Sequence, residues 1–93
     1  MMKFLLEDER LAWVQNGTLN AEMQFTRILD GKVWSVHYTY VTPEFRGRGI
    51  AGQLLDELVA QARQMDVKIK ADCKFVKEKF FIDPKYADII YQE

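Results

Sequence analysis

The sequence predicts an α+β fold, in which a mostly antiparallel sheet carries one long helix. Three observations lead to this prediction. The dipeptides Asn16-Gly17 and Asp30-Gly31, which are typical of tight hairpin turns, separate runs of alternating apolar and polar residues. An apolar stripe at helical spacing begins at Ile50. Another alternating run follows that stripe, and the resulting strand–helix–strand crossover implies two parallel strands.

The first half of the chain is expected to form an antiparallel meander. Short strands are predicted over residues 3–7 and 10–15, ahead of the first hairpin turn. A longer strand over residues 18–28 alternates regularly, so that Leu19, Ala21, Met23 and Phe25 share one face. The next strand is predicted over residues 32–41. Continuous alternation there places Tyr38 and Tyr40 with Trp34 and Val36, as aromatic residues of the core or of a cleft wall.

The second half is expected to contain the long helix, one more strand and two short helices. The helix is predicted from Ile50 to about Met65, with buried positions at Ile50, Leu54, Leu55, Leu58, Val59 and Ala62. Residues 67–73 alternate again, and Cys73 falls on the apolar side of that strand. Short helices are predicted over residues 75–81 and 85–91. No linker or repeat interrupts the sequence, which predicts a single domain over residues 1–93.

Composition excludes several functional classes. The 13 basic and 14 acidic residues give a net charge of −1, which does not favour nucleic-acid binding. No apolar run approaches the ~18 residues of a transmembrane helix, so no membrane partner is expected. The single cysteine allows no internal disulfide, and a cytoplasmic setting is therefore expected. One cysteine and one histidine, without a nearby carboxylate pair, predict no metal site.

The most informative segment is the glycine turn (residues 43–52), which reads Pro-Glu-Phe-Arg-Gly-Arg-Gly-Ile-Ala-Gly. It joins a predicted strand directly to the long helix. A turn of this kind directs backbone N–H groups and the positive end of the helix dipole at one spot, which suits a phosphate or pyrophosphate. It is not a Walker loop, because Ile50-Ala51 stands where that motif has Lys followed by Ser or Thr. The antiparallel meander also excludes the dinucleotide-binding fingerprint, which needs a parallel sheet.

The pattern Arg46-x-x-Gly49-x-Ala51 resembles the coenzyme A pyrophosphate loop of the GNAT superfamily of N-acetyltransferases, written Arg/Gln-x-x-Gly-x-Gly/Ala. The order of predicted elements also follows this superfamily and its acyl-CoA N-acyltransferase fold. The chain is similar to the minimal, single-domain branch, truncated relative to larger members. That branch has a cysteine followed by an aromatic and an aliphatic residue, as in Cys73-Lys74-Phe75-Val76. It often has His-Thr-x-Val before the loop, where this chain has Tyr38 before Thr39 and an offset His37.

The resemblance implies an enzyme that binds acetyl-coenzyme A and transfers its acetyl group to an amine of a small molecule or a protein. The implied cofactor-binding residues are Val41, Arg46, Gly47, Arg48, Gly49, Ile50 and Ala51. The end of the strand before the loop would hydrogen-bond the pantetheine as an added strand. Two alternatives stay open. One is a coenzyme A-binding sensor or interaction module without catalysis, and the other is a scaffold whose loop is vestigial. The chain would act as a monomer or a homodimer.

Cys73 is the candidate catalytic residue. It would accept the acetyl group as a thiolate, or else it is a buried structural thiol, as free cysteines often are. The offset of His37 argues against giving it the histidine's role in the family, and a surface or hydrogen-bonded residue is expected there. Glu22, Glu44 and Asp72 are possible general bases that no spacing distinguishes.

Overall fold

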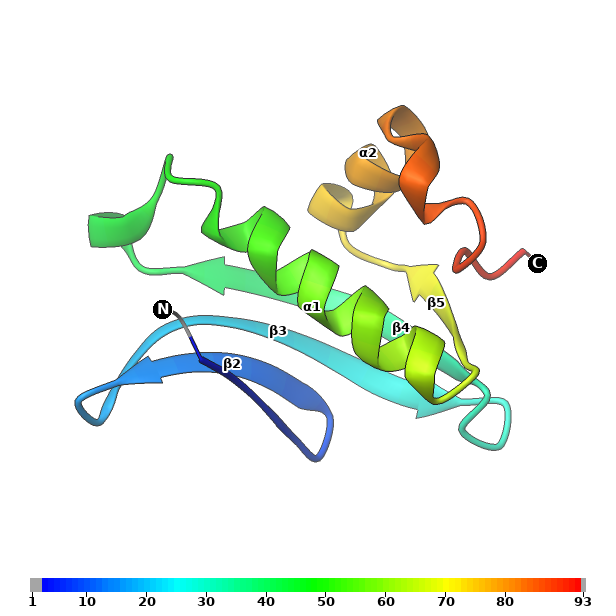
Figure 1. The fold of residues 1–93 in the computed structure, drawn as a ribbon, viewed down its shortest axis with the longest axis horizontal. Helices are drawn as coiled ribbons and strands as arrows, with labels where there is room; N and C mark the ends of the chain where they lie inside the picture. Colours follow the sequence, from blue (N-terminus) through cyan, green and yellow to red (C-terminus); the bar gives the residue numbers. More distant parts are fainter. Residues whose placement is uncertain (1–2, 93) are drawn as a thin grey trace.

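A five-stranded sheet forms the centre of the protein, as a computed structural model describing residues 3–92 shows (Figure 1). The strands lie in the order β1-β2-β3-β4-β5, and only β4 and β5 are parallel. The strands are β1 (Phe4–Glu7), β2 (Arg10–Gln15), β3 (Thr18–Ile28), β4 (Val33–Val41) and β5 (Lys68–Ala71), and the helices are α1 (Ile50–Gln64) and α2 (Lys74–Ile82). The predicted α+β class and the β-α-β crossover are confirmed.

Both predicted hairpin turns are present. Asn16 and Gly17 have φ angles of 53° and 76° and connect the paired residues Gln15 and Thr18. Asp30 and Gly31 belong to a longer connection, which leads into β4. A non-glycine residue at positive φ is uncommon, and asparagine and aspartate tolerate it best. These four residues therefore help to determine where the chain reverses between β2 and β3 and between β3 and β4.

The strand β4 contains a β-bulge at His37 that the alternation of the sequence did not predict. Gln24 pairs with Tyr38, but Phe25 pairs with Val36, so His37 is the extra residue. A bulge moves all later side chains of the strand to the opposite face. Tyr38 and Tyr40 thus lie on the face opposite Trp34 and Val36, and Tyr38 is 42% exposed. The prediction that these tyrosines share the face of Trp34 and Val36 is wrong.

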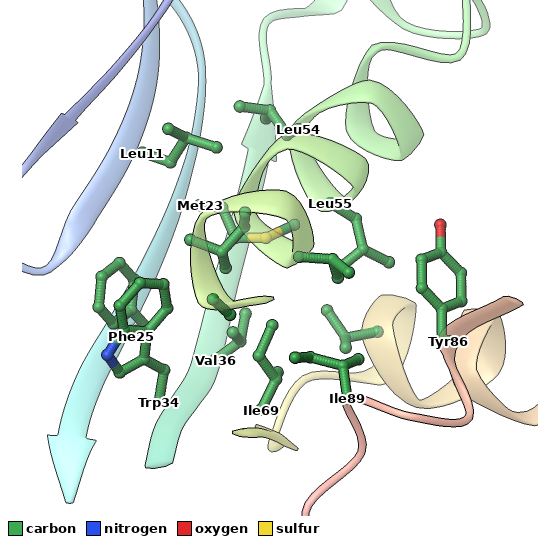
Figure 2. Close-up of a cluster of buried hydrophobic side chains, with 14 of the residues drawn as sticks. Leu11, Met23, Phe25, Trp34, Val36, Leu54, Leu55, Ile69, Tyr86 and Ile89 are labelled. Atoms are coloured by element: carbon green, nitrogen blue, oxygen red, sulfur yellow. The ribbon is translucent and has the colours of Figure 1, made fainter. Parts of the chain in front are cut away.

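The core lies between α1 and one face of the sheet. All six apolar residues predicted for the buried face of α1 are buried. They pack with side chains from the sheet, among them Met23 and the stacked rings of Phe25 and Trp34, whose centroids are 4.7 Å apart (Figure 2). Each fully buried large apolar side chain contributes about 1.5–3 kcal/mol. The helix is therefore held on β2 to β5 mainly by its apolar stripe.

The C-terminal segment differs from the prediction. The helix predicted over residues 75–81 is confirmed as α2, but residues 85–91 do not form another helix. After a 3-10 helix (Pro84–Tyr86) and a turn over residues 87–89, Ile90 forms an isolated parallel bridge with Ile69 of β5. The N–H of Ile69 donates to the carbonyl of Ile89 at 2.8 Å, and the N–H of Tyr91 donates to the carbonyl of Ile69 at 2.8 Å. This pairing satisfies backbone groups at the edge of β5, which a helix could not do.

The strand β5 is also shorter than predicted. It ends at Ala71, and Cys73 is the N-cap residue of α2. No helix among residues 3–92 is long and apolar enough to cross a membrane.

Candidate functional site

The strands β4 and β5 separate halfway along β4 (Figure 1). They pair from Val33 with Lys68 to Val36 with Ala71, after which the chain turns away through Asp72 into α2. The N–H of Thr42 bonds to the carbonyl of Asn20 in β3 at 2.9 Å. Because hydrogen bonding alternates along an antiparallel strand, the backbone groups of Thr39 and Val41 point the other way, into the opening. Within the described part of the chain, no strand pairs with that edge of β4.

The glycine turn lies at the open end of this split. Gly47 and Gly49 have φ angles of 80° and 76°, a region that costs a residue with a Cβ roughly 1–2 kcal/mol. Gly49 is the N-cap residue of α1, and the first N–H to bond within the helix is that of Gln53, which donates to the Gly49 carbonyl at 3.1 Å. The N–H groups from Gly47 to Gly52 have no acceptor among residues 3–92. They are free to bind an anion.

A cleft of about 460 Å³ lies between the glycine turn and α2. Its volume lies in the range of small-molecule sites. It is lined by Val41, Phe45, Arg46, Gly47, Gly49, Ile50, Ala51, Gly52, Gln53, Asp56, Phe75 and Lys79. The structure therefore brings together every predicted cofactor-binding residue except Arg48, whose guanidinium lies 5.5 Å from the ring centre of Phe45. A second hollow, of about 510 Å³, lies beyond β5 and contains no residue of the turn.

Sequence reasoning missed the far wall of the cleft. Phe75 and Lys79 come from α2, and the Lys79 ammonium lies 5.8 Å from the ring centre of Phe75. Their i, i+4 spacing puts both on one side of a helix, which is the signal that could have found them. The exposed side chains of Gln53 and Asp56 on α1 also line the cleft, together with these residues of α2.

Charges in the cleft are mostly positive. Arg46 donates from Nε to the carbonyl of Val41 at 2.9 Å, which holds the turn against the end of β4. The one carboxylate in the lining, Asp56, accepts a hydrogen bond of 2.5 Å from the hydroxyl of Tyr86 and pairs with Lys85 at 3.3 Å. Burial, together with that hydrogen bond, raises the pKa of Tyr86, so the hydroxyl stays protonated at neutral pH. The ammonium of Lys85 partly neutralises the charge of Asp56, so the cleft still favours an anion.

Cys73 lies beside the split, partly buried, and outside the lining of the cleft. Its Sγ is 3.5 Å from the hydroxyl oxygen of Thr39. The bulge at His37 puts Thr39 opposite Met23, on the face that meets α1. A residue of β4 and the first residue before α2 thus meet across the opening between the two parallel strands.

The other candidate catalytic residues lie away from the cleft. His37 is exposed, and its Nε2 is 3.2 Å from the hydroxyl of Thr26, in agreement with the surface role expected for it. Glu22 is buried on the face opposite α1, where it pairs with Arg10 at 3.6 Å. Asp72 accepts a hydrogen bond from Ser35, and Glu44 is exposed. In the described residues, no group of three or more His, Cys, Asp or Glu side chains could hold a metal ion.

Comparison with known proteins connects this geometry to one family. A family model described as GCN5-related N-acetyl-transferase matches residues 9–89. A GCN5-like protein from Staphylococcus aureus, solved by NMR, aligns with 98% of this chain and 89% of its own, with a TM-score of 0.77 and 24% identity. The ribosomal-protein-alanine N-acetyltransferase of Brucella melitensis biovar Abortus 2308 aligns with 90% of this chain and 62% of its own (TM-score 0.61, 25% identity).

A third structure contains coenzyme A. It is N-acetylglutamate synthase from Neisseria gonorrhoeae, complexed with coenzyme A and N-acetyl-glutamate. It aligns with 71% of this chain and 18% of its own, with a TM-score of 0.56 and 16% identity. No curated protein matches the chain significantly.

Proposed function

The chain belongs to the GCN5-related N-acetyltransferase family, and we propose that it binds acetyl-coenzyme A in the cleft between the glycine turn and α2. It then transfers the acetyl group to an amine. The observation that carries this proposal is the set of six consecutive residues, Gly47 to Gly52, whose N–H groups have no acceptor among residues 3–92 and five of which line the cleft. Backbone donors at a helix N-terminus are suited to a pyrophosphate.

The remaining parts of the cofactor find partners along the split. Arg46, Arg48 and Lys79 supply positive charge for the phosphates. The carbonyl of Thr39 and the N–H of Val41 bond the pantetheine amides, which would lie beside β4 as an added strand. The thioester then lies in the split, near Cys73 and Thr39.

Two routes of transfer fit this placement. In the direct route, the amine attacks the thioester carbonyl, the carbon–sulfur bond breaks, and coenzyme A leaves as a thiolate that takes up a proton. The N–H of Thr39 points into the split, where the thioester lies, and can donate to the oxyanion that forms. In the second route, the thiolate of Cys73 attacks first, the carbon–sulfur bond to coenzyme A breaks, coenzyme A leaves as a thiolate that takes up a proton, and Cys73 carries the acetyl group as a new thioester. The amine then takes the acetyl group and releases Cys73.

A non-catalytic coenzyme A-binding module is the alternative. It is favoured by the absence of a free carboxylate in the cleft lining, because Asp56 is bonded to Tyr86 and Lys85. The direct route therefore relies on water to take the proton of the amine. The acceptor would be a small-molecule or protein amine, and a cytoplasmic monomer or homodimer is proposed.

Turnover separates these possibilities. Coenzyme A release from acetyl-coenzyme A is followed with a thiol reagent across a panel of amines, with the wild type and Cys73→Ala. Transfer by the wild type and its loss in Cys73→Ala would support the second route, and equal rates would support the direct route. Cofactor binding with no release above the protein-free blank, for any amine, would favour the binding module.

The covalent intermediate has its own test. Intact-mass spectrometry after incubation with acetyl-coenzyme A should show one added acetyl group if Cys73 is a nucleophile. The adduct should disappear on hydroxylamine treatment and be absent from Cys73→Ala. An adduct that persists in Cys73→Ala would exclude Cys73 as its site.

A further inference from the structure

The hydroxyl of Thr39 is the described side-chain partner of the Cys73 sulfur, at 3.5 Å. We propose that Thr39 is a positioning residue, whose O–H donates to Sγ of Cys73 and holds the sulfur directed into the split. The proposal deepens the function proposed above and rests on it. It assigns a task to a residue that has no role in the cofactor loop.

Two features of the backbone make the contact specific. Cys73 is the N-cap residue of α2, yet its side chain makes no hydrogen bond to the N–H groups of the helix. The sulfur therefore points across the split, toward β4. On the other side, the bulge at His37 turns Thr39 to the same face as Met23. Without that extra residue, Thr39 would point to the opposite face of the sheet, away from Cys73.

The chemistry gives the contact a direction. A thiol is a weak donor, and a hydroxyl can donate to sulfur or accept from it. When the sulfur ionises, only the hydroxyl can donate, and a hydrogen bond to a charged acceptor is about twice as strong as a neutral one. The contact can thus persist when the sulfur reacts as a thiolate, which is the form that attacks a thioester. It also restricts the rotation of the cysteine side chain.

Alkylation of the thiol tests this without any cofactor. Cys73 is the only cysteine in the sequence, so iodoacetamide uptake reports on one group. Thr39→Val keeps the shape and removes the hydroxyl, and Thr39→Ser keeps the hydroxyl. We expect alkylation at pH 7 to be about threefold to tenfold slower in Thr39→Val, because the hydrogen bond that orients the sulfur is lost. Thr39→Ser should resemble the wild type.

A matched control is available on the same strand. Ser35 donates to Asp72, the neighbour of Cys73, so Ser35→Ala removes another hydroxyl that links β4 to this segment. It should leave the alkylation rate unchanged. If Thr39→Val does not fold, Thr39→Ala takes its place, and urea unfolding confirms that the compared variants are folded.

The outcomes are distinct. Equal alkylation profiles for the wild type and Thr39→Val would overturn the proposal, and so would a Thr39→Ser variant as slow as Thr39→Val. A slow Thr39→Val in a protein that does not bind acetyl-coenzyme A would support the contact and refute the proposed function. Normal binding of acetyl-coenzyme A with unchanged alkylation would refute the role of Thr39 alone.

Discussion

Replacing Gly49 by alanine should separate the role of the glycine turn in folding from its role in binding. Gly49 has a φ of 76°, and Gly31, in the hairpin turn before β4, has a φ of 80°. A Cβ added at either position would meet no atom within 4 Å, so both substitutions cost only backbone strain. That strain is about 1–2 kcal/mol, and each 1 kcal/mol should lower the melting temperature of a domain of this size by about 4–8 °C. Gly31→Ala is therefore a matched control.

The two variants should differ in affinity. Gly49 lines the cleft, and its strained backbone sets the direction of the next N–H groups, whereas Gly31 lies outside the cleft. Losing one hydrogen bond from an N–H to a phosphate costs about 1.5–3 kcal/mol. Calorimetric titration with acetyl-coenzyme A should thus show about tenfold to hundredfold weaker binding for Gly49→Ala. Gly31→Ala should bind as the wild type does. Equal affinities in the two variants would refute the assignment of the turn.

Three other predictions concern stability. Leu58 is fully buried, so Leu58→Ala should lower the free energy of unfolding in urea by about 2–5 kcal/mol, and a loss below about 1 kcal/mol would contradict the packing of α1. Because the pKa of Tyr86 is raised by burial and by Asp56, the stability should be full below about pH 10 and fall above it. Tyr86→Phe should reduce that alkaline loss, and equal losses would count against the hydrogen bond. The bidentate hydrogen bond from Arg63 lowers the pKa of Asp88 below 3.8. Its contribution should be present above about pH 4 and disappear in more acidic solution, so an identical acid-unfolding curve in Asp88→Asn would argue against the pair.

Local signals in the sequence were sufficient for most of the fold. Turn dipeptides such as Asn16-Gly17 require backbone angles that few residues tolerate, and the apolar stripe of α1 has only one way to be buried. The glycine turn was likewise recognisable, because its glycines and its place between a strand and a helix are both local features. These features predicted most of the cleft residues that come from the end of β4 and from the glycine turn.

What the sequence did not predict depends on contacts between distant segments. The bulge at His37 leaves no mark in the alternation, since one extra residue becomes visible only in the pairing with β3. Because the sequence-based prediction assumed continuous alternation through His37, it assigned Tyr38 and Tyr40 to the wrong face of the sheet. For the same reason it did not include the contact between Thr39 and Cys73. The apolar residues near the C-terminus fit a helix or a strand equally well. Pairing with Ile69 decides between them, and that partner lies about 20 residues away.

The backbone amides of the glycine turn provide the most direct test of the central claim. In a ¹⁵N–¹H NMR titration with acetyl-coenzyme A, we expect the amide signals of residues 47–52 to shift together, along with those of Thr39 and Val41. The amide signals of Gly17 and Gly31, which lie in the hairpin turns, should stay in place. Shifts confined to other regions, or an unchanged spectrum at millimolar acetyl-coenzyme A, would contradict the claim that this turn binds the cofactor.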